Sequence, residues 1–204
     1  MKRFAIIVVL ILCYSMIYAQ EDYYELSPWS FTAEYGVSNL DGDGDATIHP
    51  ALGVSAEYAV FPFAGLSVDY YHFPLGGPTF STNVNAGDIN LTVNVNRLLF
   101  SRKDDKVVVK GYFGFGLAGY SSKYSTATAP TSVTVYSVAT SFPVLAISAE
   151  YSFLENLSFG LKAQYRPFDR NDLEGDPRYN LDNITNDNLV ALTLFLRLKL
   201  YAAN

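Results

Sequence analysis

The chain offers few residues with the chemistry of a catalytic or metal site. It contains two histidines and one cysteine in 204 residues. His49 precedes a proline and His72 continues an alternating apolar stripe, so neither has the spacing of a metal site. His72 could be the general base of a lipid-modifying enzyme, but the sequence places no serine or acid beside it. An interfacial role is favoured for His72, and we predict no catalytic residue, metal site or cofactor.

The densest group of carboxylates is the run Asp41-Gly42-Asp43-Gly44-Asp45. Carboxylate oxygens are ligands for a hard cation such as Ca²⁺, but the run lacks the downstream bidentate glutamate of an EF-hand loop. Aspartate and glycine are also ordinary turn residues. The run therefore predicts a solvated surface loop, with calcium binding as the alternative.

The N-terminus has the pattern of a secretory signal peptide over residues 1–19. Lys2 and Arg3 are followed by an apolar stretch and by Ile17-Tyr18-Ala19, a plausible cleavage site. The alternative, an uncleaved anchor, is disfavoured because the stretch is short for a membrane span. The mature chain would contain no cysteine, 12 basic and 20 acidic side chains, a net charge of −8. Such a chain forms no disulfide and has no basic patch for nucleic acid.

The elements that must position any polar site are predicted to be strands. Apolar and polar residues alternate with a period of two, most regularly where Ile89, Leu91, Val93 and Val95 interleave with polar residues. Each segment has at least roughly the 9 to 11 residues of a tilted membrane-crossing strand. The segments cover residues 29–38, 51–60, 65–73, 88–98, 107–120, 142–153, 157–167 and 189–201.

The connections between these segments alternate in length. Three are short, at 61–64, 99–106 and 154–156, and four are long and polar, at 39–50, 74–87, 121–141 and 168–188. Outer-membrane barrels have short periplasmic turns and long extracellular loops. We predict an all-β fold: an eight-stranded antiparallel up-and-down transmembrane β-barrel over residues 29–204, after a cleaved signal peptide and a periplasmic segment over 20–28.

The polar side of the strands is rich in small residues, as the narrow lumen of an eight-stranded barrel requires. That side also carries nearly balanced charges, and buried charges must be paired. We therefore predict an ion-pair network that closes the periplasmic half of the lumen. Its members are Glu34, Glu57, Asp69, Lys110, Glu150, Lys162, Arg166, Arg197 and Lys199.

Three features carry a family resemblance: the signal peptide ending in Tyr-Ala-Gln, the turn Phe61-Pro62-Phe63-Ala64-Gly65, and the strand from Leu66 to Tyr71. With these the chain resembles the outer-membrane β-barrel proteins of Bacteroidota, and its architecture is similar to the OmpA/OmpX-type barrel. The resemblance implies a place in the bacterial outer membrane, contact with its lipid and lipopolysaccharide, and insertion by the barrel assembly machinery. An unknown envelope protein is a further possible partner.

The leading functional hypothesis is a closed, non-enzymatic barrel that acts as a structural, anchoring or surface-binding protein through its long extracellular loops. The alternative is a channel for small solutes or hydrophobic compounds, which the charged lumen disfavours. A lipid A modifying enzyme and a component of a secretion complex are the remaining alternatives.

Overall fold

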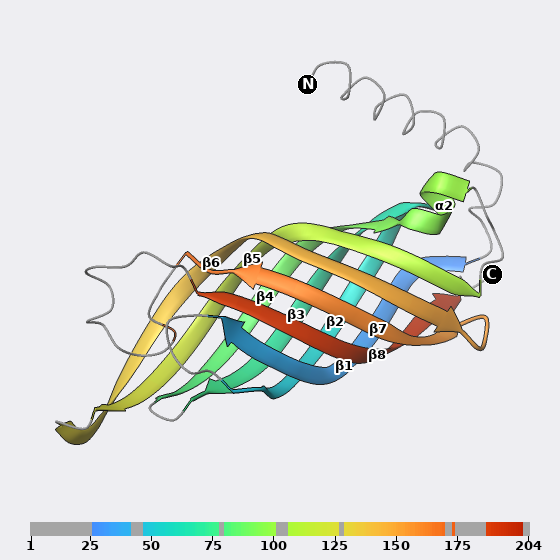
Figure 1. The fold of residues 1–204 in the computed structure, drawn as a ribbon. Coiled ribbons are helices and arrows are strands. Elements are labelled where there is room, and N and C mark those ends of the chain that lie inside the picture. The colour runs from blue at the N-terminus through green and yellow to red at the C-terminus, as the bar shows by residue number, and fades with distance from the viewer. Residues whose placement is uncertain are drawn as a thin grey trace, which may run out of the picture.

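The computed structural model describes residues 26–41, 47–77, 80–100, 106–126, 129–169, 173 and 187–201. Eight strands in chain order close into one antiparallel barrel, in which β1 also pairs with β8 (Figure 1). The predicted fold class is confirmed. The strands are β1 (Leu26–Asp41), β2 (His49–Phe61), β3 (Ala64–Gly76), β4 (Phe80–Asn94), β5 (Val107–Thr126), β6 (Ala129–Ser152), β7 (Leu157–Pro167) and β8 (Asn188–Tyr201).

The barrel is apolar outside and contains its polar side chains inside. In β4, Asp88, Asn90 and Thr92 are buried in the lumen, whereas Ile89 and Leu91 between them are exposed. Large apolar side chains are exposed on the outer face of every strand, with Leu194 of β8 61% exposed as an example. A wall of this kind is stable only in contact with hydrocarbon, so the strands span a membrane. Among the described residues, no helix has the length and apolar character needed to cross one.

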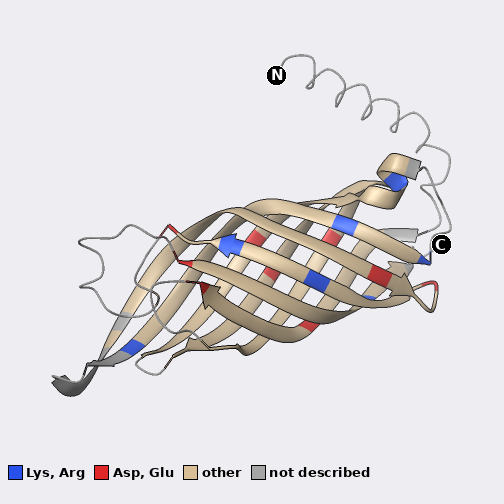
Figure 2. Ribbon diagram, in the orientation of Figure 1, with Lys and Arg blue, Asp and Glu red and all other residues tan. Residues whose placement is uncertain are grey.

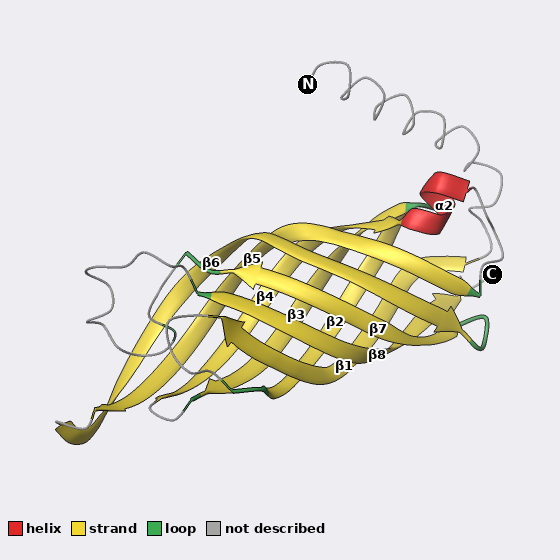
Figure 3. Cartoon of the chain, viewed as in Figure 1, coloured by secondary structure: helices red, strands yellow, loops and turns green. Residues whose placement is uncertain are grey.

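One end of the barrel carries the short connections. The start of β1, the end of β8 and a short helix, α2 (Val95–Phe100), all lie there (Figures 1 and 3). Pro62 and Phe63 join β2 to β3, and residues 153–156 join β6 to β7. Short turns mark the periplasmic side of an outer-membrane barrel. The predicted signal peptide and residues 20–25 of the predicted periplasmic segment lie outside the described residues.

The predicted strand over 88–98 is wrong at both ends. β4 starts eight residues earlier, at Phe80, and ends at Asn94, where α2 begins. The Asn94 side chain accepts a hydrogen bond from the backbone N–H of Arg97 at 3.1 Å, which is the contact of a helix N-cap. The alternation of apolar and polar residues continues through Val95 and Asn96, but these two residues belong to the capped helix. The pattern therefore predicted a strand that is too long at this end.

Two of the four predicted long loops are also wrong, because they are mostly strand. β3 and β4 extend to Gly76 and from Phe80, and β5 and β6 continue to Thr126 and from Ala129. Their polar residues resemble loop residues in the sequence. They nevertheless belong to paired strands, as Thr82 of β4 pairs with Ser122 of β5. β5 and β6 form a ribbon that projects beyond the other strands at the extracellular end (Figure 1).

An extra residue in β6 changes which side chains face the lumen. Gly114 of β5 pairs with Val144, whereas Gly116, two residues on, pairs with Ser141, three residues back along β6. Ala139 and Ser141 are buried above this β-bulge, and Val144 and Ser148 below it. Above the bulge the odd-numbered residues of β6 face the lumen, and below it the even-numbered residues do. The change occurs at Phe142 and Pro143.

The extracellular half of the lumen is filled by apolar side chains. Phe73 of β3 and Val84 of β4 are completely buried there, together with Phe168 and Leu173 from the segment after β7. The alternating pattern predicts charges inside the barrel but not this apolar layer. Its members are Leu40, Ala51, Tyr71, Phe73, Leu75, Phe80, Val84, Ala86, Ala118, Tyr120, Ala139, Phe168, Leu173, Leu189 and Ala191.

Candidate functional site: the barrel lumen

The structure places all nine charged residues of the predicted network inside the barrel, seven of them buried and two, Lys110 and Lys199, partly exposed. A tenth residue, Asp88, joins them through an ion pair with Arg166. With Asp88 the network has five acidic and five basic groups, so these ten residues together are neutral. Asp88 is not in the predicted network, although its alternation with outward-facing Ile89 and Leu91 is the sequence signal that places it inside. Figure 2 shows these charges distributed over the strands of the wall.

Three layers make up the network, and the first lies at the periplasmic end around Arg197. The Arg197 guanidinium lies between two carboxylates, with its Nη1 atom 3.2 Å from Glu57 and 3.0 Å from Glu150. Lys110 donates to both oxygens of Glu57, at 2.9 and 3.1 Å. Lys199 lies 3.8 Å from Glu150. Strands β2, β5, β6 and β8 are thereby linked across the lumen.

The second layer is centred on Lys162 of β7. Its Nζ atom lies 3.1 Å from a Glu34 oxygen, 3.5 Å from an Asp69 oxygen and 2.5 Å from the Tyr71 hydroxyl oxygen. Neutral side chains donate to the same carboxylates, Thr193 to Glu34 and Asn90 to Asp69, both at 2.9 Å. A buried charge persists when it is paired and hydrogen-bonded in this way.

The third layer is a fully buried pair. Arg166 of β7 and Asp88 of β4 contact each other with no exposed side-chain surface on either residue. Gln164 also donates to Asp88, at 3.3 Å. The Arg166 guanidinium carbon lies 5.6 Å from the ring centroid of Phe73 and 6.0 Å from that of Phe168, within cation–π range. Arg166 therefore joins the charged layers to the apolar layer above them.

Two glycines of β5 make room for this network. A β-carbon on Gly114 would lie 2.1 Å from the Asn90 side-chain oxygen, and one on Gly116 would lie 2.2 Å from an Asp88 oxygen. Both distances are far below van der Waals contact. The lumen needs both glycines because polar side chains of β4, and at Gly114 also the Ile89 carbonyl, occupy the space of a β-carbon.

Four described residues after β7, Phe168, Asp169, Leu173 and Asp187, make contacts at the extracellular end of the barrel. Leu173 is completely buried, and its carbonyl accepts hydrogen bonds from the hydroxyls of Thr82 and Ser122. Its N–H donates to buried Asp187 at 3.0 Å. Asp169 holds the same segment to β6 by accepting bonds from the N–H and hydroxyl of Thr140, at 2.7 and 2.6 Å. Charged layers thus lie below an apolar layer in the described part of the lumen.

The other candidate residues do not assemble into a reactive site among the described residues. His72 Nδ1 contacts the Asn85 side-chain oxygen at 3.0 Å, and the Tyr70 hydroxyl donates to that oxygen at 2.9 Å. His49 Nε2 contacts the Thr47 hydroxyl at 2.8 Å. No group of three or more His, Cys, Asp or Glu side chains within the described ranges could hold a metal ion. Residues 42–46 of the acidic run lie outside those ranges.

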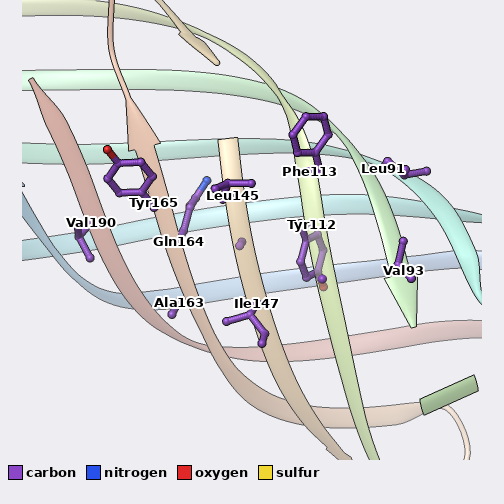
Figure 4. Close-up of a pocket in the computed structure, with 12 residues that line it drawn as sticks. Leu91, Val93, Tyr112, Phe113, Leu145, Ile147, Ala163, Gln164, Tyr165 and Val190 are labelled. Carbon is purple, nitrogen blue, oxygen red and sulfur yellow. The ribbon is translucent and has the colours of Figure 1, made fainter. Parts of the chain in front are cut away.

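A shallow hollow of about 650 Å³ lies on the outer wall across β4 to β8 (Figure 4). Its rim consists of exposed apolar side chains, among them Phe113, Ile147 and Tyr165, and the small residues Gly111 and Ala163 leave the space between them. Its lining also includes Tyr112 and Gln164, which hydrogen-bond Arg197 and Asp88 of the charged network.

No family model and no curated protein matches the chain. The fold, however, is similar to solved structures. Neisserial surface protein A has a TM-score of 0.57 and 15% identity, covering 85% of this chain and 97% of its own. A major outer membrane protein of Thermus thermophilus gives 0.53 and 16%, covering 84% and 99%. Ail, the attachment invasion locus protein of Yersinia pestis, gives 0.51 and 8%, covering 85% and 99%.

These similarities, at low identity, concern the fold. They agree with the closed eight-stranded topology described above. The more specific resemblance to barrels of Bacteroidota stays a prediction. The chain has the fold of the eight-stranded outer-membrane β-barrels.

Proposed function

We propose that the protein is a non-conducting barrel that anchors a binding surface at the outside of the outer membrane. The observation that carries this proposal is the double closure of the lumen. Ion pairs tie opposite walls together in the periplasmic half, and Phe168 and Leu173 complete an apolar layer in the extracellular half. Water and ions have no favourable path through an apolar layer of this kind.

The extracellular parts are the surface available for binding. The sequence predicts this role for four long loops, and the ribbon of β5 and β6 takes the place of one of them. Its exposed side chains are mostly uncharged, with Tyr136 81% exposed and Val138 61% exposed. Exposed apolar side chains above the membrane are typical of contact surfaces. One protein of the same fold is named for attachment and invasion. Lipid and lipopolysaccharide surround the barrel, and the assembly machinery remains an expected partner during insertion.

Conductance tests the closed lumen directly. Purified mature protein in a planar bilayer should give no stable conductance, whereas the channel alternative requires reproducible open events. A stable open level would refute the closed-lumen proposal.

Binding is tested on intact cells by chemical crosslinking, mild detergent extraction and mass spectrometry. A chain in which residues 123–136 are replaced by a short Asn-Gly turn should still fold, because the shortened strands remain paired below the ribbon. We expect a surface partner to be lost in this variant and retained in Lys123→Gln. Equal recovery from all three chains would exclude the ribbon as the contact surface.

A further inference from the structure

The hollow on the outer wall lies between two rows of outward-facing residues, in which each residue pairs with the next across β4 to β8 (Figure 4). The upper row consists only of large side chains. The lower row alternates large residues with one glycine and one alanine, and the hollow lies where these two small residues leave space. From β4 to β8, the upper row is Leu91, Phe113, Leu145, Tyr165 and Val190, and the lower row is Val93, Gly111, Ile147, Ala163 and Leu192.

The floor of the hollow is open above and fixed from below. A β-carbon on Gly111 would meet no atom within 4 Å, so the packing of the strands does not require a glycine there. Tyr112 and Gln164 also line the hollow, but their side chains are buried and held in the lumen. Arg197 donates to the Tyr112 hydroxyl at 2.9 Å, and Gln164 donates to Asp88 at 3.3 Å. The hollow is therefore preformed, which lowers the cost of binding a ligand.

The hollow runs obliquely up the membrane-spanning wall. Its β4 end is at Val93, one residue before that strand ends on the periplasmic side, and its β8 end is at Val190, two residues after that strand begins on the extracellular side. Four strand spacings of about 4.8 Å give it a length of about 19 Å. One leaflet of the hydrocarbon core, half of about 30 Å, is about 15 Å deep. The length therefore matches a chain that crosses one leaflet at an angle.

A polar pair marks the extracellular end of the hollow. The Tyr165 hydroxyl donates to the Asn188 side-chain oxygen at 2.9 Å, on the outer face of the barrel. Tyrosines with an apolar ring and a polar tip lie at the level of the lipid headgroups in membrane proteins. Below this pair the outward-facing lining is apolar, with Phe113 and Ile147 both about half exposed. One end of the hollow thus meets the headgroups and the rest meets hydrocarbon.

We infer that the hollow binds one acyl chain of a membrane lipid, whose polar end lies at Tyr165 and Asn188. The hollow is continuous with the wall that contacts bilayer hydrocarbon, and an unfilled space there would forfeit dispersion contacts. Its volume of about 650 Å³ is that of a small-molecule site. An acyl chain can bend along the oblique course, whereas a second barrel would bring an equally convex wall. This lipid site is separate from the extracellular contact surface and does not depend on it.

Photocrosslinking tests the occupant. The mature barrel is placed in phosphatidylcholine vesicles that contain a trace of phospholipid with a diazirine on its acyl chain, and adducts are located by mass spectrometry. Ile147 and Ala163 should be labelled several-fold more than Val54 of β2, which is also exposed and lies on the opposite side of the barrel. Equal labelling of all three would overturn the inference.

The position of the diazirine tests the orientation of the chain. A diazirine near the carboxyl end of the acyl chain should label Tyr165, and one at the chain terminus should label Val93. The reverse order would place the polar end of the lipid at the periplasmic side and would contradict the assigned role of Tyr165 and Asn188.

Two glycines of β5 provide matched variants for a second measurement. Gly111→Leu should fill the hollow. Gly119→Leu is the control, because a β-carbon there also meets no atom within 4 Å and this outward-facing position is not part of the lining. After mild detergent extraction, native mass spectrometry should show several-fold less lipid-bound barrel for Gly111→Leu and the wild-type amount for Gly119→Leu.

Heat-modifiable migration on gels checks that both variants fold, and Ala163→Leu fills the other half of the hollow if Gly111→Leu does not. Equal lipid retention in wild type, Gly111→Leu and Gly119→Leu, or equal loss in both variants, would refute a specific site. A mass of two barrels that disappears only in Gly111→Leu would assign the hollow to a second copy of the chain and overturn the proposed occupant.

Discussion

Lys162 of β7 and Glu34 of β1 form an ion pair at 3.1 Å, although β8 separates their strands in the wall. The contact runs through the lumen rather than along the sheet. It holds together strands that are far apart in the sequence, and it does so at a level where both side chains are almost fully buried. The stability of the barrel therefore depends on charges that a soluble protein would expose.

Replacing Lys162 by methionine should destabilise the barrel strongly, because Glu34 and Asp69 would remain buried without their shared cation. Breaking a buried pair from one side costs about 3–5 kcal/mol. Urea unfolding in lipid vesicles, followed by gel migration, measures the loss. Lys123→Met is the exposed control, and the further change Asp69→Asn should recover part of the loss. A Lys162→Met barrel as stable as the wild type would contradict the pairing.

The glycines of β5 give a matched pair of variants. Gly114→Ala would place a β-carbon 2.1 Å from the Asn90 side-chain oxygen and 2.2 Å from the Ile89 carbonyl oxygen, and overpacking costs about 1–3 kcal/mol. Gly111→Ala in the same strand meets no atom within 4 Å and should be neutral. The folded fraction after refolding into detergent measures both. An equal effect of the two substitutions would mean that strand propensity, and not the lumen contact, decides the outcome.

Asp187→Ala should loosen the extracellular closure, because the buried N–H of Leu173 loses its acceptor. An unsatisfied buried donor costs about 1–3 kcal/mol. Limited proteolysis of intact cells should then cut between residues 173 and 187 faster than in the wild type. Asp41→Ala, which removes an exposed carboxylate at the end of β1, should leave the rate unchanged. Unchanged cleavage in Asp187→Ala would show that Leu173 is held by its other contacts.

Leu194→Arg tests the membrane boundary on the outer wall. Leu194 lies midway along the apolar stripe of β8, and an arginine at the bilayer midplane costs about 2–4 kcal/mol. Thr134→Arg, on the projecting ribbon, should cost little because that position is outside the hydrocarbon. Reversible unfolding in vesicles compares the two. Similar losses would place the ribbon inside the membrane and contradict the orientation.

The strands of the membrane-spanning belt could be predicted from the sequence because lipid and lumen impose opposite polarity on alternate residues. The pattern is regular in β4, where Ile89 and Leu91 face lipid and Asn90 between them faces inward. Above the belt both sides of a strand meet water or protein, so the pattern weakens. Polar residues such as Asn83 and Ser121 then resemble a loop, although they pair in register.

The apolar layer could not be predicted for a related reason. Tyr71 and Phe73 share the inward phase of Asp69, so β3 changes from a polar to an apolar interior along one face. Alternation reports which residues share a face but not what fills the space opposite. That space is filled by Phe168 and Leu173, which lie about one hundred residues further along the chain.

The extra residue at Phe142 and Pro143 has a consequence for how this protein can change over evolutionary time. Above the bulge, even-numbered residues such as Tyr136 and Val138 face outward because one residue has been inserted into the phase of β6. Deleting a single residue there would leave the lower barrel intact. In the ribbon part of β6, side chains that face inward would then face outward, and those that face outward would face inward. A one-codon deletion could thus replace the entire exposed chemistry of that strand in one step, without any substitution in the ribbon itself.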